Sequence, residues 1–150
     1  RLVHGQILEA WVPFLKIACI LVADDQVASD FFRETVIRMA VPGDVKVIGC
    51  SVAALSHEHR FVRGRGPKTI VLFNTISDAC TARRLGFSFD TLNIGNIYNE
   101  ECRLCCTPAV LLSDEDVQAI IGLRDAGVKV ELQQVPREKP IDLLEIVSKM

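Results

Sequence analysis

The 150-residue chain is 49% apolar and carries 17 basic against 19 acidic residues, which gives a formal charge of −2. This length suits one domain with a sizeable core, and such evenly mixed charge offers no broad cationic face to nucleic acid or to an anionic membrane. No apolar run is long enough to cross a bilayer, and no secretory signal opens the chain. We therefore predict a single soluble, cytoplasmic domain over residues 1–150 that does not bind nucleic acid. Because the chain begins at Arg1 and not at Met, we allow for missing residues before it, a first strand among them.

Apolar periodicity predicts strands and helices in alternation along the chain. Short apolar runs, many of them β-branched, predict strands over Ile17–Val22, Val45–Cys50, Thr69–Phe73, Thr91–Ile94, Ala109–Leu112 and Val128–Leu132. Patterns of helical period predict helices over about residues 5–15, 26–39, 51–61, 74–85 and 113–127, and from Pro140 onward. This alternation predicts an α/β fold: a three-layer open sheet, mostly parallel, with helices on both faces.

Local signals mark several helix ends. Pro13 is expected to bend or end the first helix, because proline cannot continue the hydrogen-bond ladder. Ser51 is expected to cap the third helix. Ser113 with Asp116 three residues later resembles a capping box, and Gly127 is expected to end the helix that follows.

His4 is the residue most suited to chemistry, because Gly5 follows it and an amphipathic helical pattern begins two residues later. Free N–H groups at a helix start carry partial positive charge, and Arg1 adds a planar, permanently charged fork. Neutral imidazole in this place could accept a phosphoryl group. From the residues alone, however, an ordinary turn histidine is the more common explanation.

Polar residues that follow three of the predicted strands are the other candidates, because sites in parallel sheets lie at the carboxyl ends of strands. Asp24 and Asp25 follow the first strand, where they could orient His4 or contact a partner; helix capping by Asp25 is an equal alternative. Asn74, Gly95 and Asn96 follow two other strands and could add donors to the same crevice. Turn formation is the favoured explanation for these three residues.

Six cysteines raise the question of a metal or redox site. Cys102, Cys105 and Cys106 include a CxxC spacing that allows two thiolates to reach one zinc ion or to form a redox pair. The other three cysteines lie in separate apolar or helical segments, so four zinc ligands are not assembled by the sequence. Structural or incidental thiols are therefore favoured, and we predict neither a metal nor a cofactor.

Several segments together resemble one family, the IIB component of the mannose/fructose/sorbose family of the bacterial phosphoenolpyruvate-dependent sugar phosphotransferase system. The first is Arg1-Leu-Val-His-Gly-Gln6, which is similar to that family's phosphorylation-site motif and is followed by Trp11 at the usual distance. The others occur in the family's order over the rest of the chain: Asp24–Ala28, Leu92–Gly95, Asp114–Val117 and Val130–Pro136.

The resemblance implies that His4 accepts a phosphoryl group from a phosphohistidine of a IIA component and passes it to a sugar bound by the membrane components IIC and IID. It implies the activity of a protein-N(pi)-phosphohistidine–sugar phosphotransferase, with Arg1, Gly5 and Gln6 around the phosphate and no cofactor. It also implies peripheral association with the inner membrane through IIC and IID, and it leaves a homodimer open.

The chain departs from the family pattern near Trp11, where many members have a second arginine and this chain has Glu9 and Ala10. The alternative function is therefore a regulatory phosphorylation-state relay, or a binding module of the same fold, without a dedicated sugar permease. A nucleotide-binding domain is disfavoured, because neither G-x-G-x-x-G nor a P-loop motif follows a predicted strand.

Overall fold

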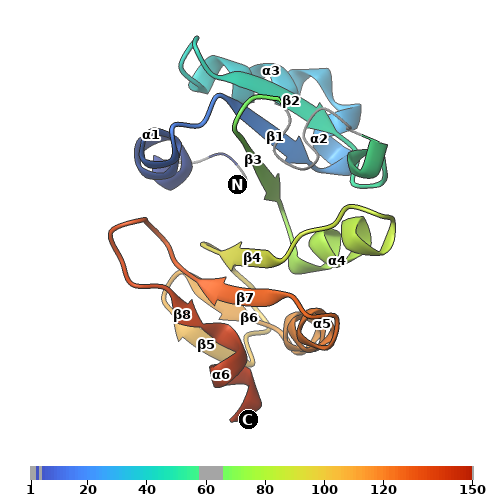
Figure 1. The fold of residues 1–150 in the computed structure, drawn as a ribbon, viewed down its shortest axis with the longest axis vertical. Coiled ribbons are helices and arrows are strands. Elements are labelled where there is room, and N and C mark those ends of the chain that lie inside the picture. The colour runs from blue at the N-terminus through green and yellow to red at the C-terminus, as the bar shows by residue number, and fades with distance from the viewer. Residues whose placement is uncertain (1–2, 4, 58–65, 150) are drawn as a thin grey trace. The chain divides into compact units, whose positions relative to one another are not determined.

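The computed structural model describes residue 3 and residues 5–57 and 66–149 (Figure 1). The chain divides into two compact units. The first comprises the chain up to Asn74 together with Thr81–Phe87, and the second comprises Thr75–Cys80 and the chain from Ser88 onward. That residues 1–150 act as a single domain stays a prediction.

The first unit is built on a three-stranded parallel sheet, in the order β2-β1-β3. The central strand β1 (Cys19–Ala23) pairs with β2 (Lys46–Cys50) on one side and with β3 (Thr69–Phe73) on the other. Every residue of β1 is buried, as expected for a continuous apolar strand between two covered faces. These three strands confirm the corresponding predictions to within two residues at their ends.

Helices cover both faces of this sheet, because alternate side chains of β1 point to opposite sides. Ile20 and Val22 join one core cluster, and Leu21 and Ala23 join another. The first cluster takes side chains from η1 (Gln6–Trp11), α1 (Val12–Leu15), α2 (Asp25–Ser29) and α3 (Phe31–Ala40). The second takes them from η2 (Ala53–His57) and from the last turns of α4 (Ile76–Arg84). The α/β class, with mostly parallel strands and helices on both faces, is confirmed.

The second unit contains two further sheets around its own core. In one, β7 (Lys129–Leu132) pairs in parallel with β4 (Thr91–Ile94) and antiparallel with β8 (Ile141–Asp142). In the other, β5 (Leu104–Thr107) and β6 (Val110–Leu112) form an antiparallel pair. The core includes buried side chains from β4, β6 and β7 and from α5 (Asp114–Asp125) and α6 (Leu143–Ser148).

Two of the predicted helices differ in detail. The first is a π-helix over Gln6–Trp11 that continues as α1, with Pro13 near the start of α1, where a missing N–H is tolerated. The helix predicted over 26–39 is two helices, because Asp30 adopts an extended conformation and its carboxylate caps α3 by accepting from Phe32 N–H and Arg33 N–H. The apolar pattern of helical period continues through Asp30, so the sequence did not reveal this break.

The remaining end signals are mostly confirmed. Ser113 and Asp116 form the predicted capping box, at 3.2 and 2.9 Å, and Gly127 ends the helix with a φ of +86°. The helix predicted from Pro140 begins only at Leu143, because the preceding residues pair with β7 as β8 and Asp142 caps α6. Ser51 Oγ accepts from Ala54 N–H at 3.1 Å, so it caps η2; the predicted end of that helix near Phe61 lies outside the described residues.

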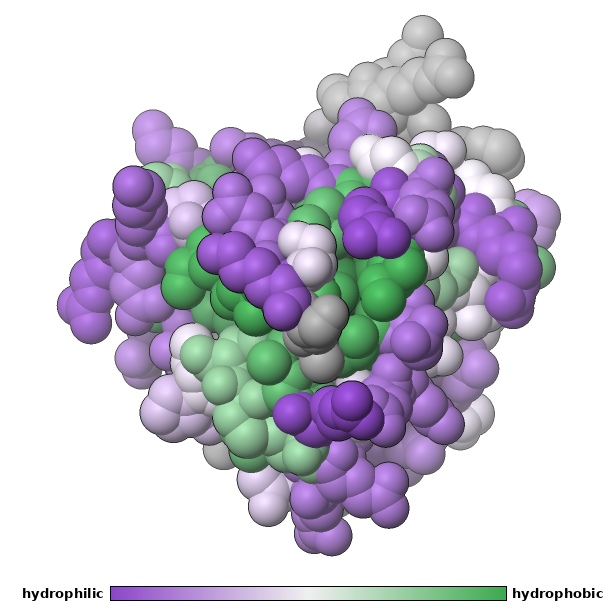
Figure 2. All heavy atoms as spheres, turned by 90° about the horizontal axis from the view of Figure 1, so that it is seen from below, coloured by the Kyte–Doolittle hydropathy of each residue, from purple (hydrophilic) through white to green (hydrophobic). Residues whose placement is uncertain are grey.

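Figure 2 shows one face of the molecule, on which apolar side chains gather in a central area bordered by hydrophilic ones.

By exposed fraction, the largest open apolar side chains among the described residues include four on a single helix, α3: Phe31, Phe32, Val36 and Met39. The apolar side chains of the segment predicted as one helix over residues 26–39 are therefore divided. Val27 of α2 and Ile37 of α3 join the core, whereas these four face solvent.

Candidate functional site

The structure describes the residues on both sides of His4. Arg1 and His4 themselves, the two residues on which the predicted chemistry depends, lie outside the described residues. Val3 on one side of His4 and Ile7 on the other pack against the core cluster of the first unit. Gly5 has helical dihedrals, φ −54° and ψ −39°, and its position is exposed. Val3 and Ile7 are thus anchored to a buried core, whereas Gly5, directly after His4, is open to solvent.

Gln6 and Glu9 lie in the first turns after Gly5. Gln6, predicted to bind phosphate, is half-buried at the start of η1. Glu9 is exposed, and its carboxylate oxygen would lie 3.8 Å from a Cβ atom built on Gly5. A negative charge therefore stands beside the residue that follows His4. In the sequence, Glu9 is visible only as a departure from a family pattern, and the pattern does not show where its charge lies.

Asp24, Asp25 and Asn74 are brought to the same edge of the sheet of the first unit. Ala23 and Phe73 are register partners at the ends of β1 and β3, so Asp24 and Asn74 follow neighbouring strand ends. Asn74 is exposed. The predicted gathering of these three residues at the carboxyl ends of parallel strands is present, whereas their roles stay predictions.

The two carboxylates at this edge hold backbone groups. Asp24 is buried, and its Oδ1 accepts from Val27 N–H at 3.0 Å, so Asp24 and not Asp25 caps α2. Asp25 Oδ1 accepts from Val52 N–H at 2.8 Å. Asp25 therefore ties the loop after β1 to the loop after β2. No local sequence signal could have revealed this contact, because its partners are 27 residues apart.

Gly95 and Asn96 belong to the second unit, where they follow β4. A Cβ on Gly95 would lie 3.7 Å from the carbonyl oxygen of Gln133, and Asn96 is exposed. Gln133 N–H donates to Ile94 O at 3.3 Å, and Asn93 Nδ2 donates to Gln133 O at 3.0 Å, so the chain after β4 lies against the chain after β7. A crevice shared by these residues with Asp24 and Asn74 stays a prediction.

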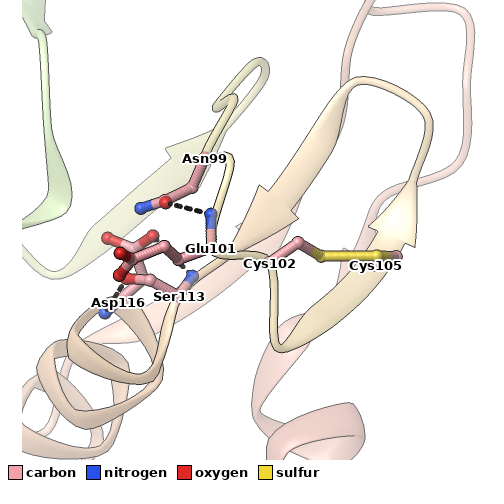
Figure 3. Close-up of a disulfide and its surroundings, with 6 residues drawn as sticks. All are labelled: Asn99, Glu101, Cys102, Cys105, Ser113 and Asp116. Atoms are coloured by element: carbon pink, nitrogen blue, oxygen red, sulfur yellow. Dashed lines mark hydrogen bonds between the residues drawn. A yellow bond between two sulfur atoms is a disulfide. The ribbon is translucent and has the colours of Figure 1, made fainter.

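A disulfide joins Cys102, in the turn before β5, to Cys105, on β5 itself (Figure 3). The favoured prediction of structural or incidental thiols, which rested on the lack of a fourth zinc ligand, is therefore wrong for Cys102 and Cys105, whereas a pair of thiols at the CxxC spacing was the alternative that the sequence left open. Close to it, Asn99 Oδ1 accepts from Glu101 N–H at 3.0 Å. Cys106 is half-buried, and burial raises the pKa of its thiol. Within the described part of the chain, no three His, Cys, Asp or Glu side chains are grouped so as to hold a metal ion.

Comparison with known proteins decides the family. The family described as "PTS system sorbose subfamily IIB component" matches residues 1–150. The chain belongs to this family.

Relatives of this IIB component cover nearly its whole length. It is 32% identical over 147 residues to the "PTS system fructose-specific EIIB component" of Bacillus subtilis (strain 168), with 98% of this chain and 90% of the relative covered. It is 29% identical over 148 residues to the "PTS system sorbose-specific EIIB component" of Klebsiella pneumoniae, with 99% and 90% covered. The solved structure of the IIBSor domain of the sorbose permease from Klebsiella pneumoniae has a TM-score of 0.85 at 29% identity and covers 100% of this chain and 92% of that one.

IIB components relay a phosphoryl group toward a sugar in the phosphotransferase system, and they act with IIA and with IIC/IID partners. The chain is accordingly a phosphotransferase component. None of its described helices combines the length and the apolar character that a membrane span requires. Its membership of the family confirms the resemblance carried by the segment Arg1–Gln6 and by the later motifs.

Proposed function

We propose that His4 is the phosphoryl carrier of this IIB component. In this proposal, His4 accepts the group from the phosphohistidine of a IIA component and donates it to a sugar held by IIC and IID. The observation that carries the proposal is the family match over the whole chain, which includes the segment Arg1-Leu-Val-His-Gly-Gln6. The anchoring of Val3 and Ile7 in the core on either side of His4 supports it.

The chemistry is a direct exchange of one N–P bond for another. An unprotonated ring nitrogen of His4 attacks phosphorus as the N–P bond of the donor histidine breaks; in the second step the N–P bond on His4 breaks as a sugar oxygen attacks and loses its proton. Histidine suits both steps, because an ordinary pKa near 6.5 leaves much of the imidazole neutral at pH 7. The charge on the phosphoryl oxygens requires positioned donors, which Arg1 and the N–H groups after Gly5 would supply.

The activity would be that of a protein-N(pi)-phosphohistidine–sugar phosphotransferase, with the protein in the cytoplasm and held at the inner membrane through IIC and IID. The relatives differ in the sugar that their names carry, fructose in one and sorbose in the other. We propose that the membrane components, which hold the sugar in this proposal, also select it.

The decisive experiment compares two histidine variants. The protein is incubated with phosphoenolpyruvate and the upstream phosphotransferase proteins, and acid-labile phosphate is located by mass spectrometry. His4→Ala should abolish labelling and leave the circular dichroism spectrum unchanged. His57→Ala, at an exposed histidine of η2, is the matched control and should label as the wild type does. Labelling retained in His4→Ala would refute the assignment.

Arg1 is tested by Arg1→Lys, which keeps the charge and removes the planar fork that can hold two oxygens. Loss of one such hydrogen bond should slow phosphoryl acceptance roughly fivefold to tenfold without changing the free energy of unfolding. An unchanged rate would mean that Arg1 does not hold the phosphoryl group.

A regulatory relay is the second candidate, and the position of Glu9 favours it. Its carboxylate stands against Gly5, where it opposes the accumulation of negative charge near His4. In this case the protein would still be labelled on His4 but would not pass phosphate to fructose or sorbose in vesicles that contain the family's IIC and IID components. Transfer to either sugar would exclude a purely regulatory role.

A further inference from the structure

Helix α3 presents an unusual outer face. Phe31, Phe32, Val36 and Met39 are 83%, 75%, 50% and 81% exposed. At about 100° per residue, Phe32, Val36 and Met39 form one stripe along the helix, and Phe31 lies at its edge. The opposite side of the helix is also apolar, since Ile37 packs against the core. Solvated side chains of this size, contiguous on one helix, indicate an interaction surface.

The charged side chains of α3 and its N-cap are already paired within the chain. Arg38 binds Glu34 at 2.6 Å, and Arg33 contacts Asp30 at 3.5 Å and donates to Gln26 at 2.8 Å. The surface is therefore neutral and apolar. Amphipathic helices that bind anionic membranes carry basic residues available to lipid, and acidic partners need such residues as well. Neither fits a helix whose two arginines are each matched by a carboxylate.

The stripe is complementary to itself, and we propose that its occupant is the α3 helix of a second copy of this chain. If the two helices run antiparallel about a twofold axis between Thr35 and Val36, Phe32 of each copy lies opposite Met39 of the other. The thioether of Met39 then contacts the edge of an aromatic ring, which is a favourable arrangement. With a twofold axis, each contact occurs twice and both stripes are covered. The two helix dipoles run in opposite directions, which is electrostatically favourable.

The area of the stripe places this association among small, transient interfaces. An aromatic side chain buries roughly 150–250 Å², so two largely exposed phenylalanines with Val36 and Met39 offer roughly 450 Å² per copy, or about 900 Å² in the pair. Stable dimers bury more than about 1,200 Å². The α3 pair is therefore a weak, reversible dimer, with a dissociation constant between roughly 10 µM and 1 mM.

Charge substitution at the predicted register tests the proposal. Sedimentation velocity of the wild type across roughly 10 µM to 1 mM should show a rising dimer fraction. Phe32→Lys or Met39→Glu alone should each raise the dissociation constant at least about tenfold, because each would press an unpaired charge against the apolar side chain opposite it. The double variant should regain association that salt weakens, since lysine of one copy would face glutamate of the other. Tyr98→Lys, at a 73% exposed aromatic outside α3, is the control and should dimerise as the wild type does.

Other outcomes overturn the proposal in distinct ways. A wild type that stays monomeric at every concentration has no self-association through α3. Failure of the double variant to regain association rejects the antiparallel register. Binding of the monomer to phosphatidylglycerol vesicles that is lost in Phe32→Lys would instead identify a lipid surface as the occupant. Circular dichroism of each variant verifies that the exposed substitutions leave the helix intact.

Discussion

The carboxylate of Asp25 accepts a hydrogen bond from the backbone N–H of Val52 at 2.8 Å. Asp25 opens α2, just after Asp24 and the end of β1, and Val52 follows the end of the neighbouring strand β2. Val52 is buried, so its N–H has little access to water. This one contact joins two loops at the sheet edge where the sequence predicted a site.

Asp25→Ala should lower the free energy of unfolding by roughly 1–3 kcal/mol, because a buried backbone donor would lose its partner. Asp25→Asn keeps an oxygen acceptor and should lose less than about 1 kcal/mol. Urea denaturation measures both, with Asp44→Ala at an exposed carboxylate as the control. Slower phosphorylation of Asp25→Asn at unchanged stability would add a direct role near His4 to this structural one.

Glu9→Gln should accelerate phosphoryl acceptance. If His4 is the phosphoryl carrier, the carboxylate beside Gly5 repels the incoming group, and a unit charge about 8 Å from a dianion in water costs roughly 1 kcal/mol. Removal of the charge should therefore raise the rate of labelling roughly threefold to tenfold, with the larger effect at low salt. Glu115→Gln, at an exposed carboxylate of α5, is the control. Equal rates at low salt would show that Glu9 does not act on the phosphoryl group.

Lys16→Gly should stabilise the protein. Lys16 ends α1 in the left-handed conformation, with φ 54° and ψ 49°, which glycine adopts without the steric cost that a Cβ brings. After the greater flexibility of glycine in the unfolded chain is subtracted, the gain should be about 0.5–1 kcal/mol. Thermal unfolding should show a higher Tm than the wild type for Lys16→Gly. The Tm of Lys16→Ala, which keeps the Cβ, should not rise. A gain from both would point to the loss of the lysine charge as the cause.

The Cys102–Cys105 disulfide should contribute modestly to stability. It closes a short loop, for which chain entropy gives a contribution of about 2 kcal/mol at most. The Cys102→Ser, Cys105→Ser double variant should lose no more than this in urea denaturation, and hydrogen exchange should rise around β5 and its turn. Cys106→Ser is the control outside the bridge. Alkylation of denatured, unreduced protein should label only Cys19, Cys50, Cys80 and Cys106; labelling of all six would mean that the bridge is absent.

Sequence alone determined the features that depend on short-range patterns. Continuous apolar runs identified β1 and the other main strands, and the Ser113–Asp116 capping box and Gly127 marked both ends of α5, because each depends on residues within a few positions of one another. Family membership was also within reach, because it rests on several separate motifs distributed over the chain.

The tertiary structure decided what depends on distant partners. Asp24 and Asp25 are equivalent in sequence, yet one caps its own helix and the other binds a backbone group 27 residues away. Residues 141–142 form a strand only because β7 is available to pair with them. Periodicity finds the apolar positions of α3 but cannot divide them between core and solvent, because that division depends on which side of the helix the sheet covers.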